Sequence, residues 1–350
     1  MTTELGLPTV GGLVGVPTAD EPQKAKDYKS DQEVRWCPGC GDYVVLNAVQ
    51  SFLPTLGLKR ENIVFVSGIG CSSRFPYYMN TYGMHSIHGR APAIATGLAV
   101  ARPDLSVWVV TGDGDALSIG GNHLIHTLRR NVNLKILLFN NRIYGLTKGQ
   151  YSPTSEEGKV TKSTPLGSLD HPFNPVSLAL GAEATFVGRA VDSDRAGLTE
   201  VLRQAAEHRG SALVEIYQNC PIFNDGAFDV LKDADEAARR IINVVDGQPI
   251  TFGNGEYAVV RDGFGLAVAR TADVPASDVV VHDAADLNLA FALSRLSTQD
   301  LRHTVTGVFR NVARTTYDDA ARAQVEQAKA AKPADLRALL HGKDTWTVVG

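Results

Sequence analysis

The chain has 350 residues, enough for one large domain or for one domain with an appendage. Its 44% hydrophobic and 21% charged residues are ordinary for a globular protein, and a net charge of −4 gives no electrostatic reason to expect nucleic acid as a partner. No apolar run approaches the roughly 18 residues needed to span a bilayer. The first residues lack the basic and apolar regions of a signal peptide, so we expect a cytoplasmic protein without membrane association.

The first two thirds of the chain predict a tail followed by an α/β domain. Residues 1–30 are rich in Gly, Pro and charged residues without periodicity, which predicts a flexible N-terminal tail. In residues 31–230, short apolar or β-branched runs alternate with helix-like segments, which predicts a parallel sheet with helices on both faces. The expected strands are 63–67, 107–111, 134–139 and 212–217, and the expected helices are 43–52, 91–101, 121–130 and 194–207.

Residues 231–350 differ in character and predict an α+β C-terminal extension made of a hairpin and helices. The pattern over 231–245 is typical of a charged amphipathic helix. Residues 249–261 contain a Gly-Asn-Gly turn between two strand-like runs, which predicts a β-hairpin. Residues 286–345 have a mostly helical pattern. This extension contains no catalytic motif, so we expect the chemistry in residues 31–230.

Two polar motifs follow neighbouring predicted strands. Gly112-Asp113-Gly114 comes directly after one strand, and Asn140-Asn141 follows the next. Because the carboxyl ends of parallel strands meet at one edge of a sheet, where ligands bind, Asp113 and Asn141 should converge. The two motifs together resemble the thiamine-diphosphate fingerprint. A pair of ordinary strand-to-helix turns is the alternative, but the pairing of the motifs favours the cofactor.

The residue types suit a Mg²⁺ ion that holds a diphosphate. Mg²⁺ prefers six hard oxygen ligands and commonly joins protein carboxylates to substrate phosphates. Asp113 offers a carboxylate, Asn141 an amide oxygen, and Ile143 a backbone carbonyl. Gly112 and Gly114 allow the backbone to approach the phosphates closely. The helix expected near residues 120–121 directs its N-terminal dipole toward them.

Four cysteines suggest a second inorganic centre. Cys37 and Cys40 form a Cys-x-x-Cys pair, and Cys71 and Cys220 each follow a predicted strand on the cofactor side of the sheet. Four thiolates suit either a [4Fe–4S] cluster or a tetrahedral Zn²⁺ ion. Buried cysteines without a metal are the third interpretation. The thiamine context favours the cluster, because electrons from an oxidised substrate then have an acceptor.

Eight motifs occur in an order that resembles the β subunits of 2-oxoacid:ferredoxin oxidoreductases, and most closely their 2-oxoglutarate-type branch. The resemblance covers about residues 31–320. The motifs are Trp36–Gly41, Gly68–Ser72, His88–Ala91, Thr111–Asp115, Gly120–His123, Asn140–Asn141, Ile143–Gln150 and Asn219–Asn224.

The resemblance implies that all four cysteines hold one [4Fe–4S] cluster. It also implies the reaction, in which a 2-oxoacid, coenzyme A and oxidised ferredoxin give an acyl-CoA, CO₂ and reduced ferredoxin. Thiamine diphosphate would provide the electron sink for decarboxylation. The competing function is a non-redox thiamine-dependent decarboxylase or lyase with structural zinc, and a third is a non-enzymatic subunit that retains the cofactor fold.

Further site residues follow from the motifs. The resemblance places His88 near the diphosphate, although a helix-entry histidine without a ligand is the alternative. Leu146 is expected to wedge the cofactor into its bent shape. Lys148 lies in the same loop, and we expect it to face the pocket and pair with the distal carboxylate of a dicarboxylic 2-oxoacid, unless it is a solvated lysine. Arg90 is a second candidate for substrate binding, and the other expected cofactor contacts are Gly70, Ser72, Gly89, Asp115 and Asn140.

We expect the chain to act only with a partner. Thiamine enzymes need a carboxylate beside the aminopyrimidine ring, and that group normally lies on a second, pyrimidine-binding domain. Residues 231–350 are too short and too poor in strand–helix alternation to form that domain. The activating carboxylate is therefore expected on a larger α subunit, and this chain itself offers no identified catalytic residue. Both a heterodimer and a dimer of heterodimers are compatible with the sequence.

Overall fold

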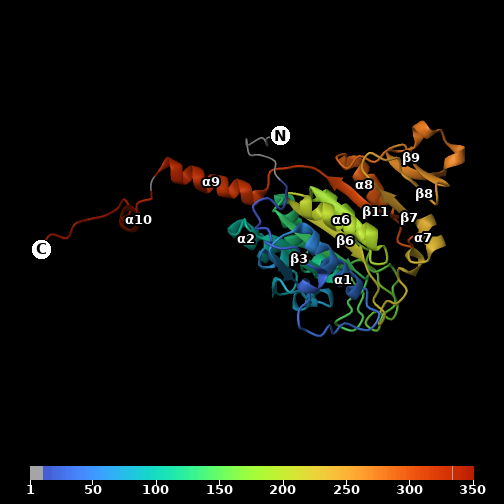
Figure 1. Ribbon diagram of the computed structural model, residues 1–350, viewed down its shortest axis with the longest axis horizontal. Helices are drawn as coiled ribbons and strands as arrows, with labels where there is room; N and C mark the ends of the chain where they lie inside the picture. Colours follow the sequence, from blue (N-terminus) through green and yellow to red (C-terminus); the bar gives the residue numbers. More distant parts are fainter. Residues whose placement is uncertain (1–10, 333) are drawn as a thin grey trace.

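Eight strands form the central sheet of the computed structural model, which describes residues 11–332 and 334–350 (Figure 1). The strands β1 to β6 pair in parallel, whereas β11 runs antiparallel to β5 and parallel to β7. The predicted α/β fold with a mostly parallel sheet is confirmed. In sheet order the strands are β2 (Tyr82–His85), β1 (Ile63–Ser67), β3 (Ser106–Gly112), β4 (Leu134–Asn140), β6 (Ser211–Tyr217), β5 (Phe186–Val191), β11 (Thr304–Asn311) and β7 (Ile241–Val244).

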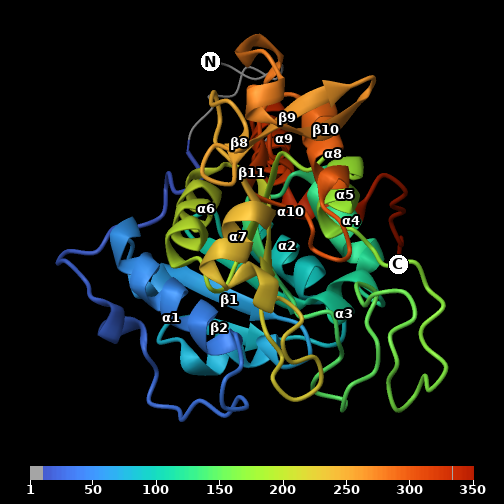
Figure 2. The ribbon, with the colours of Figure 1, turned by 90° about the vertical axis from the view of Figure 1, so that its right-hand side faces the viewer.

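Helices cover both faces of this sheet, and the alternation of side chains along each strand explains why (Figure 2). In β3, Val107 and Val109 join one apolar cluster, while Trp108 and Val110 join the cluster on the opposite face. Helices bury both faces of the sheet, and the side chains on both faces of β3 are accordingly apolar. The first cluster includes residues of α2 (Ala91–Ala101), α4 (Gly121–Arg130), α5 (Pro175–Gly181) and α8 (Leu287–Leu296), and the second includes residues of α1 (Asp42–Phe52) and α6 (Arg195–Glu207).

The N-terminal segment is not a free tail over the part that the structure describes. Tyr28 is fully buried and Val16 nearly so, both in the cluster that contains α1. Thr18 forms a β-bridge with Leu58. The prediction of a flexible tail is therefore wrong for residues 11–30, because isolated apolar side chains dock on the body without any periodic pattern. Residues 1–10, which the same prediction included, lie outside the described residues.

The C-terminal third contributes two strands to the main sheet, which its sequence pattern did not predict. The segment expected to be one helix over 231–245 is a shorter helix, α7 (Ala234–Arg240), followed by β7. The mostly helical pattern expected over 286–345 is interrupted by β11, whose first half pairs with β7 and whose second half pairs with β5. The predicted hairpin is present, formed by β8 (Thr251–Phe252) and β9 (Tyr257–Asp262), and β10 (Gly265–Arg270) extends it. A domain division at residue 230 stays a prediction.

The chain ends in two helices, α9 (Tyr317–Ala331) and α10 (Leu336–His341). Figure 1 shows them leading away from the body on the side opposite α8 and β9. Within residues 11–332 and 334–350, no helix has both the length and the apolar character needed to cross a bilayer.

Candidate functional site

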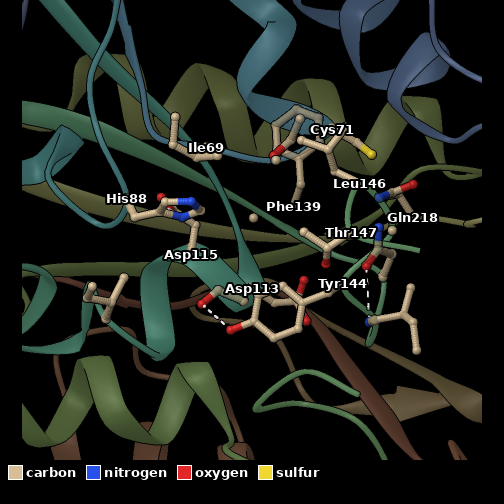
Figure 3. Close-up of a pocket in the computed structure, with 18 residues that line it drawn as sticks. Ile69, Cys71, His88, Asp113, Asp115, Phe139, Tyr144, Leu146, Thr147 and Gln218 are labelled. Atoms are coloured by element: carbon tan, nitrogen blue, oxygen red, sulfur yellow. Dashed lines mark hydrogen bonds and ion pairs between the residues drawn. The ribbon is translucent and has the colours of Figure 1, made fainter. Parts of the chain in front are cut away.

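A cavity of about 90 Å³ lies where β1, β3 and β4 end (Figure 3). Most of the residues that the sequence assigned to the cofactor or its metal ion meet there, together with one of the expected cluster ligands, Cys71, although they come from four separate segments. Those that line the cavity are Gly70, Cys71, Ser72, His88, Gly112, Asp113, Gly114, Asp115, Asn141, Ile143 and Leu146.

Asp113 begins α3 (Asp113–Leu117), a short helix that directly follows β3. Its carboxylate is almost fully buried, and burial raises its pKa to about 6. The hydroxyls of Ser152 and Thr154 donate to the same oxygen, Oδ2, at 2.5 Å and 2.7 Å. The carboxylate is thus held in one orientation, as a metal ligand requires.

A buried polar network connects this carboxylate to side chains of the neighbouring strands β6 and β5. The Thr154 hydroxyl lies 2.9 Å from Oδ1 of Asn140, whose amide nitrogen donates to Glu215 at 2.7 Å. Glu215 in turn accepts from Nε of Arg189 at 2.7 Å, and both side chains are buried. Asn140 was predicted to contact the cofactor. It does not line the cavity and instead positions the residues around Asp113.

Asn141 and Ile143 lie beside Asp113 at the end of β4. The side-chain oxygen of Asn141 accepts from the backbone N–H of Ile143 at 3.1 Å. Its backbone carbonyl accepts from Asn224 at 2.9 Å, which ties this turn to the segment that follows Cys220. Asp113, Asn141 and Ile143 thus border one cavity, and they can offer a carboxylate, an amide oxygen and the backbone carbonyl of Ile143. This donor set fits Mg²⁺.

Asp115 ties three turns together instead of pointing freely into the cavity. Its Oδ1 accepts from the backbone N–H of Gly89 at 2.8 Å, and its Oδ2 accepts from the Thr111 hydroxyl at 3.0 Å. Burial raises its pKa, while the hydrogen bonds from the backbone of Gly89 and from Thr111 act in the opposite direction. His88 is largely exposed, and its Nδ1 lies 3.5 Å from the Asp115 carboxylate. Gly89 therefore serves to place His88 at the cavity.

The ring of Tyr144 lies so close to Gly114 that no larger residue fits at position 114. A Cβ added to Gly114 would lie 2.1 Å from a ring carbon of Tyr144, and the Tyr144 hydroxyl donates to the Gly114 carbonyl at 3.0 Å. Tyr144 lines the cavity (Figure 3). Its position inside one of the recognised motifs was the only signal for it in the sequence, and no role had been assigned to it.

The loop after Ile143 folds back on itself. Tyr144 and Gln150 form a β-bridge, and Leu146 and Thr147 line the cavity. Lys148 sits at the tip with a φ of 74°, is exposed, and does not line the cavity. Lys148 thus stands outside the cavity in the single chain, and its pairing with the distal carboxylate of a substrate stays a prediction. Arg90, at the start of α2, does not line the cavity either.

The four cysteines come from three loops that adjoin one another. Sγ of Cys71 and Sγ of Cys220 each lie 3.5 Å from the position that a Cβ on Gly145 would take. The backbone N–H of Cys40 donates to the carbonyl of Cys37 at 3.0 Å, and Gly41 donates to Asn219, next to Cys220. Burial raises the pKa of the Cys71 thiol to about 12 and also raises that of Cys40, and the other cysteines contribute to both shifts.

Burial raises the pKa of a thiol, whereas binding of a metal to the thiolate lowers it. Within residues 11–332 and 334–350, no three His, Cys, Asp or Glu side chains already form a metal-holding group. A cluster at this position is therefore inferred from the convergence of the loops and from the four soft sulfur donors. That donor set fits an iron–sulfur cluster.

Sequence reasoning missed the residues that support Asp113. Ser152 and Thr154 lie 39 and 41 residues away along the chain and belong to no recognised motif. Ile119 and Gln218 also line the cavity without having been predicted. Their roles depend on contacts between distant segments, which no local pattern encodes.

Comparison with known proteins agrees with this geometry. Residues 68–216 match the family described as thiamine pyrophosphate enzyme, C-terminal TPP binding domain. This segment contains Asp113, Asn141 and Cys71. It ends before Cys220.

Two curated proteins show the range of similarity. The chain is 74% identical to 2-oxoglutarate oxidoreductase subunit KorB of Mycobacterium tuberculosis, over 99% of this chain and 94% of that protein. It is 45% identical to 2-oxoacid:ferredoxin oxidoreductase 2, subunit beta, of Aeropyrum pernix, over 57% of this chain and 64% of that protein.

A solved structure extends the agreement to three dimensions. The 2-oxoglutarate:ferredoxin oxidoreductase of Magnetococcus marinus, solved with 2-oxoglutarate, coenzyme A and succinyl-CoA bound, contains a chain that superposes with a TM-score of 0.74. The superposed chains are 35% identical and cover 93% of this chain and 98% of that chain.

Proposed function

The chain belongs to the family of 2-oxoacid:ferredoxin oxidoreductase β subunits, and from this membership we propose how its residues divide the work of the enzyme. It is the β subunit of a 2-oxoglutarate:ferredoxin oxidoreductase. Its thiamine pyrophosphate-binding domain holds the cofactor, and the finer assignments concern the metal ion, the cluster and the partner chain.

One observation carries the redox part of the proposal. Cys71 lines the cofactor cavity, and its sulfur and that of Cys220 both lie 3.5 Å from the position that a Cβ on Gly145 would take. A centre held by these thiolates therefore adjoins the cofactor. Structural zinc offers no reason for this adjacency, whereas a [4Fe–4S] cluster gives electrons a short route out of the cavity.

The residues around the cavity bind and orient the cofactor. Asp113, Asn141 and the carbonyl of Ile143 would hold Mg²⁺, and Ser152 and Thr154 fix the carboxylate that does so. Coordination through Oδ1 of Asp113 would leave both hydroxyl contacts to Oδ2 intact. Thiamine diphosphate, when bound, supplies the electron sink for decarboxylation.

Other side chains shape the cavity. Gly112 and Gly114 keep its diphosphate end open, and Ser72 and Gly70 border the side nearest Cys71. His88, held by the turn that Asp115 fixes, is placed to donate to a phosphate.

A β subunit works with an α subunit, and we assign to that partner the pyrimidine-binding domain and the activating carboxylate. Ile87, Ile119 and Leu146 are large, exposed apolar side chains close to the cavity, and Ile119 and Leu146 line it. Exposed apolar residues around an incomplete pocket are typical of an interface. We assign the final electron acceptor to a ferredoxin that docks near the exposed Cys37.

Cofactor binding tests the metal assignment. Asp113→Ala and Asn141→Ala should each abolish measurable binding of thiamine diphosphate with Mg²⁺ in calorimetry, because Mg²⁺ tolerates little loss of ligand geometry. Asn122→Ala is a matched control, since Asn122 is exposed on α4 and does not line the cavity. Near wild-type affinity in either ligand variant would contradict the metal site.

Metal analysis tests the cluster. Anaerobically purified protein should contain about four irons per chain and show a reduced-cluster EPR signal after addition of dithionite. A Ser replacement at any one of the four cysteines should lower the iron content and bleach the absorbance near 400 nm. Stoichiometric zinc in place of iron would overturn this assignment.

Activity tests the division between subunits. The complex with the α subunit should oxidise 2-oxoglutarate with coenzyme A and ferredoxin, whereas the isolated chain should not. Turnover by the isolated chain at a rate comparable to that of the complex would show that the activating carboxylate lies in this chain.

A further inference from the structure

A second cavity lies at the same edge of the sheet as the cofactor cavity, and we call it the second cavity. It has a volume of about 270 Å³ and is bordered by the start of α5 and by the loop that follows α8 (Figure 2). Asn140 and Tyr217, the last residues of β4 and β6, line it. Among the described residues, none lines both cavities. Ligands of α/β proteins bind at the carboxyl ends of parallel strands, so the second cavity is a separate candidate site.

The charged side chains that line the second cavity do not balance. Three of them are arginines and two are glutamates, which leaves one positive charge in excess. Arg189 is only 1% exposed and Arg142 is also buried, whereas Arg295, in the last turn of α8, is exposed. The two glutamates are Glu156 and Glu215. A buried arginine at a cavity wall is expensive unless each of its donors finds an acceptor.

Both carboxylates are already engaged. Glu215 is fully buried, and its Oε1 accepts from Asn140 while its Oε2 accepts from Arg189, both at 2.7 Å. In Glu156, Oε1 accepts from Arg142 at 2.7 Å, and Oε2 is sealed from solvent. Neither glutamate therefore has an oxygen that is both unpaired and open to the second cavity.

Hydrogen-bond donors, by contrast, are left over. Arg189 donates through Nε to Glu215 and through Nη1 to the Ser297 hydroxyl at 2.9 Å and the Val305 carbonyl at 3.2 Å. Its Nη2 has no partner among the described residues and is not sealed from solvent. The Ser297 hydroxyl accepts twice, from Arg189 and from the backbone N–H of Val305, so its own proton is available. Arg295 has no hydrogen-bond or ion-pair partner within the described part of the chain. Unused donors together with an excess positive charge are what an oxyanion binds.

The remaining lining indicates what the oxyanion is attached to. Pro172, Phe173 and Pro175 line the second cavity, and the ring of Phe173 is about half exposed. The volume corresponds to about nine water molecules, more than a single carboxylate or phosphate group fills. An apolar chain attached to the oxyanion would cover these side chains, whereas an inorganic ion would leave them in contact with water.

We propose that the second cavity binds a small aliphatic monocarboxylic acid, with its carboxylate on Arg189 and Arg295 and its chain on Phe173. One carboxylate matches the excess of one positive charge, and a phosphate dianion would exceed it. His171 also lines the cavity, but it is exposed and its ring lies 4.0 Å from the exposed Glu157, so this pair adds little net charge. The site is separate from the cofactor cavity and does not depend on the function proposed above.

Calorimetry on the full chain in complex with the α subunit tests the chemistry of the ligand. Butyrate, titrated at constant ionic strength, should bind at one saturable site per β chain. Butyramide has the same shape without the charge and should bind at least about tenfold more weakly, because hydrogen bonds to a charged group are lost. Acetate should bind about tenfold more weakly than butyrate, because two buried methylene groups are missing. Inorganic phosphate should bind more weakly than butyrate.

Substitutions locate the site. Arg295→Gln should weaken butyrate binding at least about tenfold. Arg302→Gln is the matched control, because Arg302 is exposed in the loop after α8, carries the same charge and does not line the second cavity. Phe173→Ala should remove most of the difference in affinity between butyrate and acetate, because that difference comes from contact of the chain with the ring.

The outcomes separate this site from the cofactor site. Neither Arg295 nor Phe173 lines the cofactor cavity, so thiamine diphosphate binding and iron content should be unchanged in both variants. Butyrate that binds instead in the 2-oxoacid pocket of the complex would be insensitive to Arg295→Gln, and that result would overturn the proposal. Absence of saturable binding, tighter binding of phosphate than of butyrate, or equal weakening by Arg302→Gln would overturn it as well.

Discussion

The hydroxyl of Thr154 lies 2.7 Å from Oδ2 of Asp113 and 2.9 Å from Oδ1 of Asn140. A hydroxyl has one proton, so it donates to the ionised Asp113 carboxylate when the metal site is in use. Asn140 is then held chiefly by its contact with Glu215 and by the backbone N–H of Arg142. Thr154 is therefore a positioning residue for the expected Mg²⁺ ligand.

We predict that Thr154→Val weakens binding of thiamine diphosphate with Mg²⁺ about 10- to 150-fold, because a buried hydrogen bond to a charged group contributes about 1.5–3 kcal/mol. Valine has nearly the same shape but no hydroxyl. Thr154→Ser keeps the hydroxyl and should remain within a few-fold of wild type in the same calorimetric titration. Equal affinities of the Val and Ser variants would show that the hydroxyl does not support Asp113.

Gly114→Ala should abolish cofactor binding through a steric effect. The new methyl group would overlap the ring of Tyr144, which lines the cavity. Gly121→Ala is the matched control, because a Cβ on Gly121 would meet no atom within 4 Å. Calorimetry should show no binding in the first variant and unaltered binding in the second. Recovery of binding in Gly114→Ala/Tyr144→Ala would confirm that overlap with the ring is the cause.

Substitutions of Lys148 test whether this residue helps the enzyme to select 2-oxoglutarate over pyruvate. It is exposed in the single chain, so a role in binding the distal carboxylate of 2-oxoglutarate requires that the α subunit closes over it. Lys148→Asn removes the charge and tolerates the left-handed φ of 74°, whereas Lys148→Arg keeps the charge. With the α subunit present, the ratio of kcat/KM for 2-oxoglutarate over pyruvate should fall at least about tenfold in the Asn variant. The Arg variant should lose less, and an unchanged ratio in both would identify a solvated lysine.

His208 predicts a pH dependence of stability. Its ring is buried between Thr185 and Asn311, and burial, with a contribution from Lys135, lowers its pKa to about 3. The unfolded chain, with a pKa near 6.5, binds this proton more readily between pH 3 and 6.5. The free energy of unfolding should therefore rise with pH across this window, by up to about 1.4 kcal/mol per pH unit, and level off above it.

Thermal unfolding of the cofactor-free chain at a series of pH values measures this effect. His208→Gln should flatten the slope below pH 6.5, whereas His341→Gln, at the exposed end of α10, should leave it unchanged. If the slope of His208→Gln equals that of wild type, other groups govern acid stability.

Sequence alone was sufficient for the centre of the fold. The four predicted strands became β1, β3, β4 and β6, because each is a short apolar run whose two faces are both buried. The sequence also predicted that Asp113 and Asn141 converge, and both residues line one cavity. The carboxyl ends of adjacent parallel strands must meet, so the position of each motif in the chain determines its place in space.

Only the tertiary structure decided which residues support that site and which leave it. Thr154 reaches Asp113 across 41 residues, Tyr144 packs on Gly114, and a turn directs Lys148 away from the cavity. Tertiary pairing also made a strand of β11, in a segment whose local pattern is largely helical. Local sequence determines the conformational preferences of a segment and the types of its donor atoms. Contacts between distant segments, whose energies depend on packing, decide which of those groups face one another.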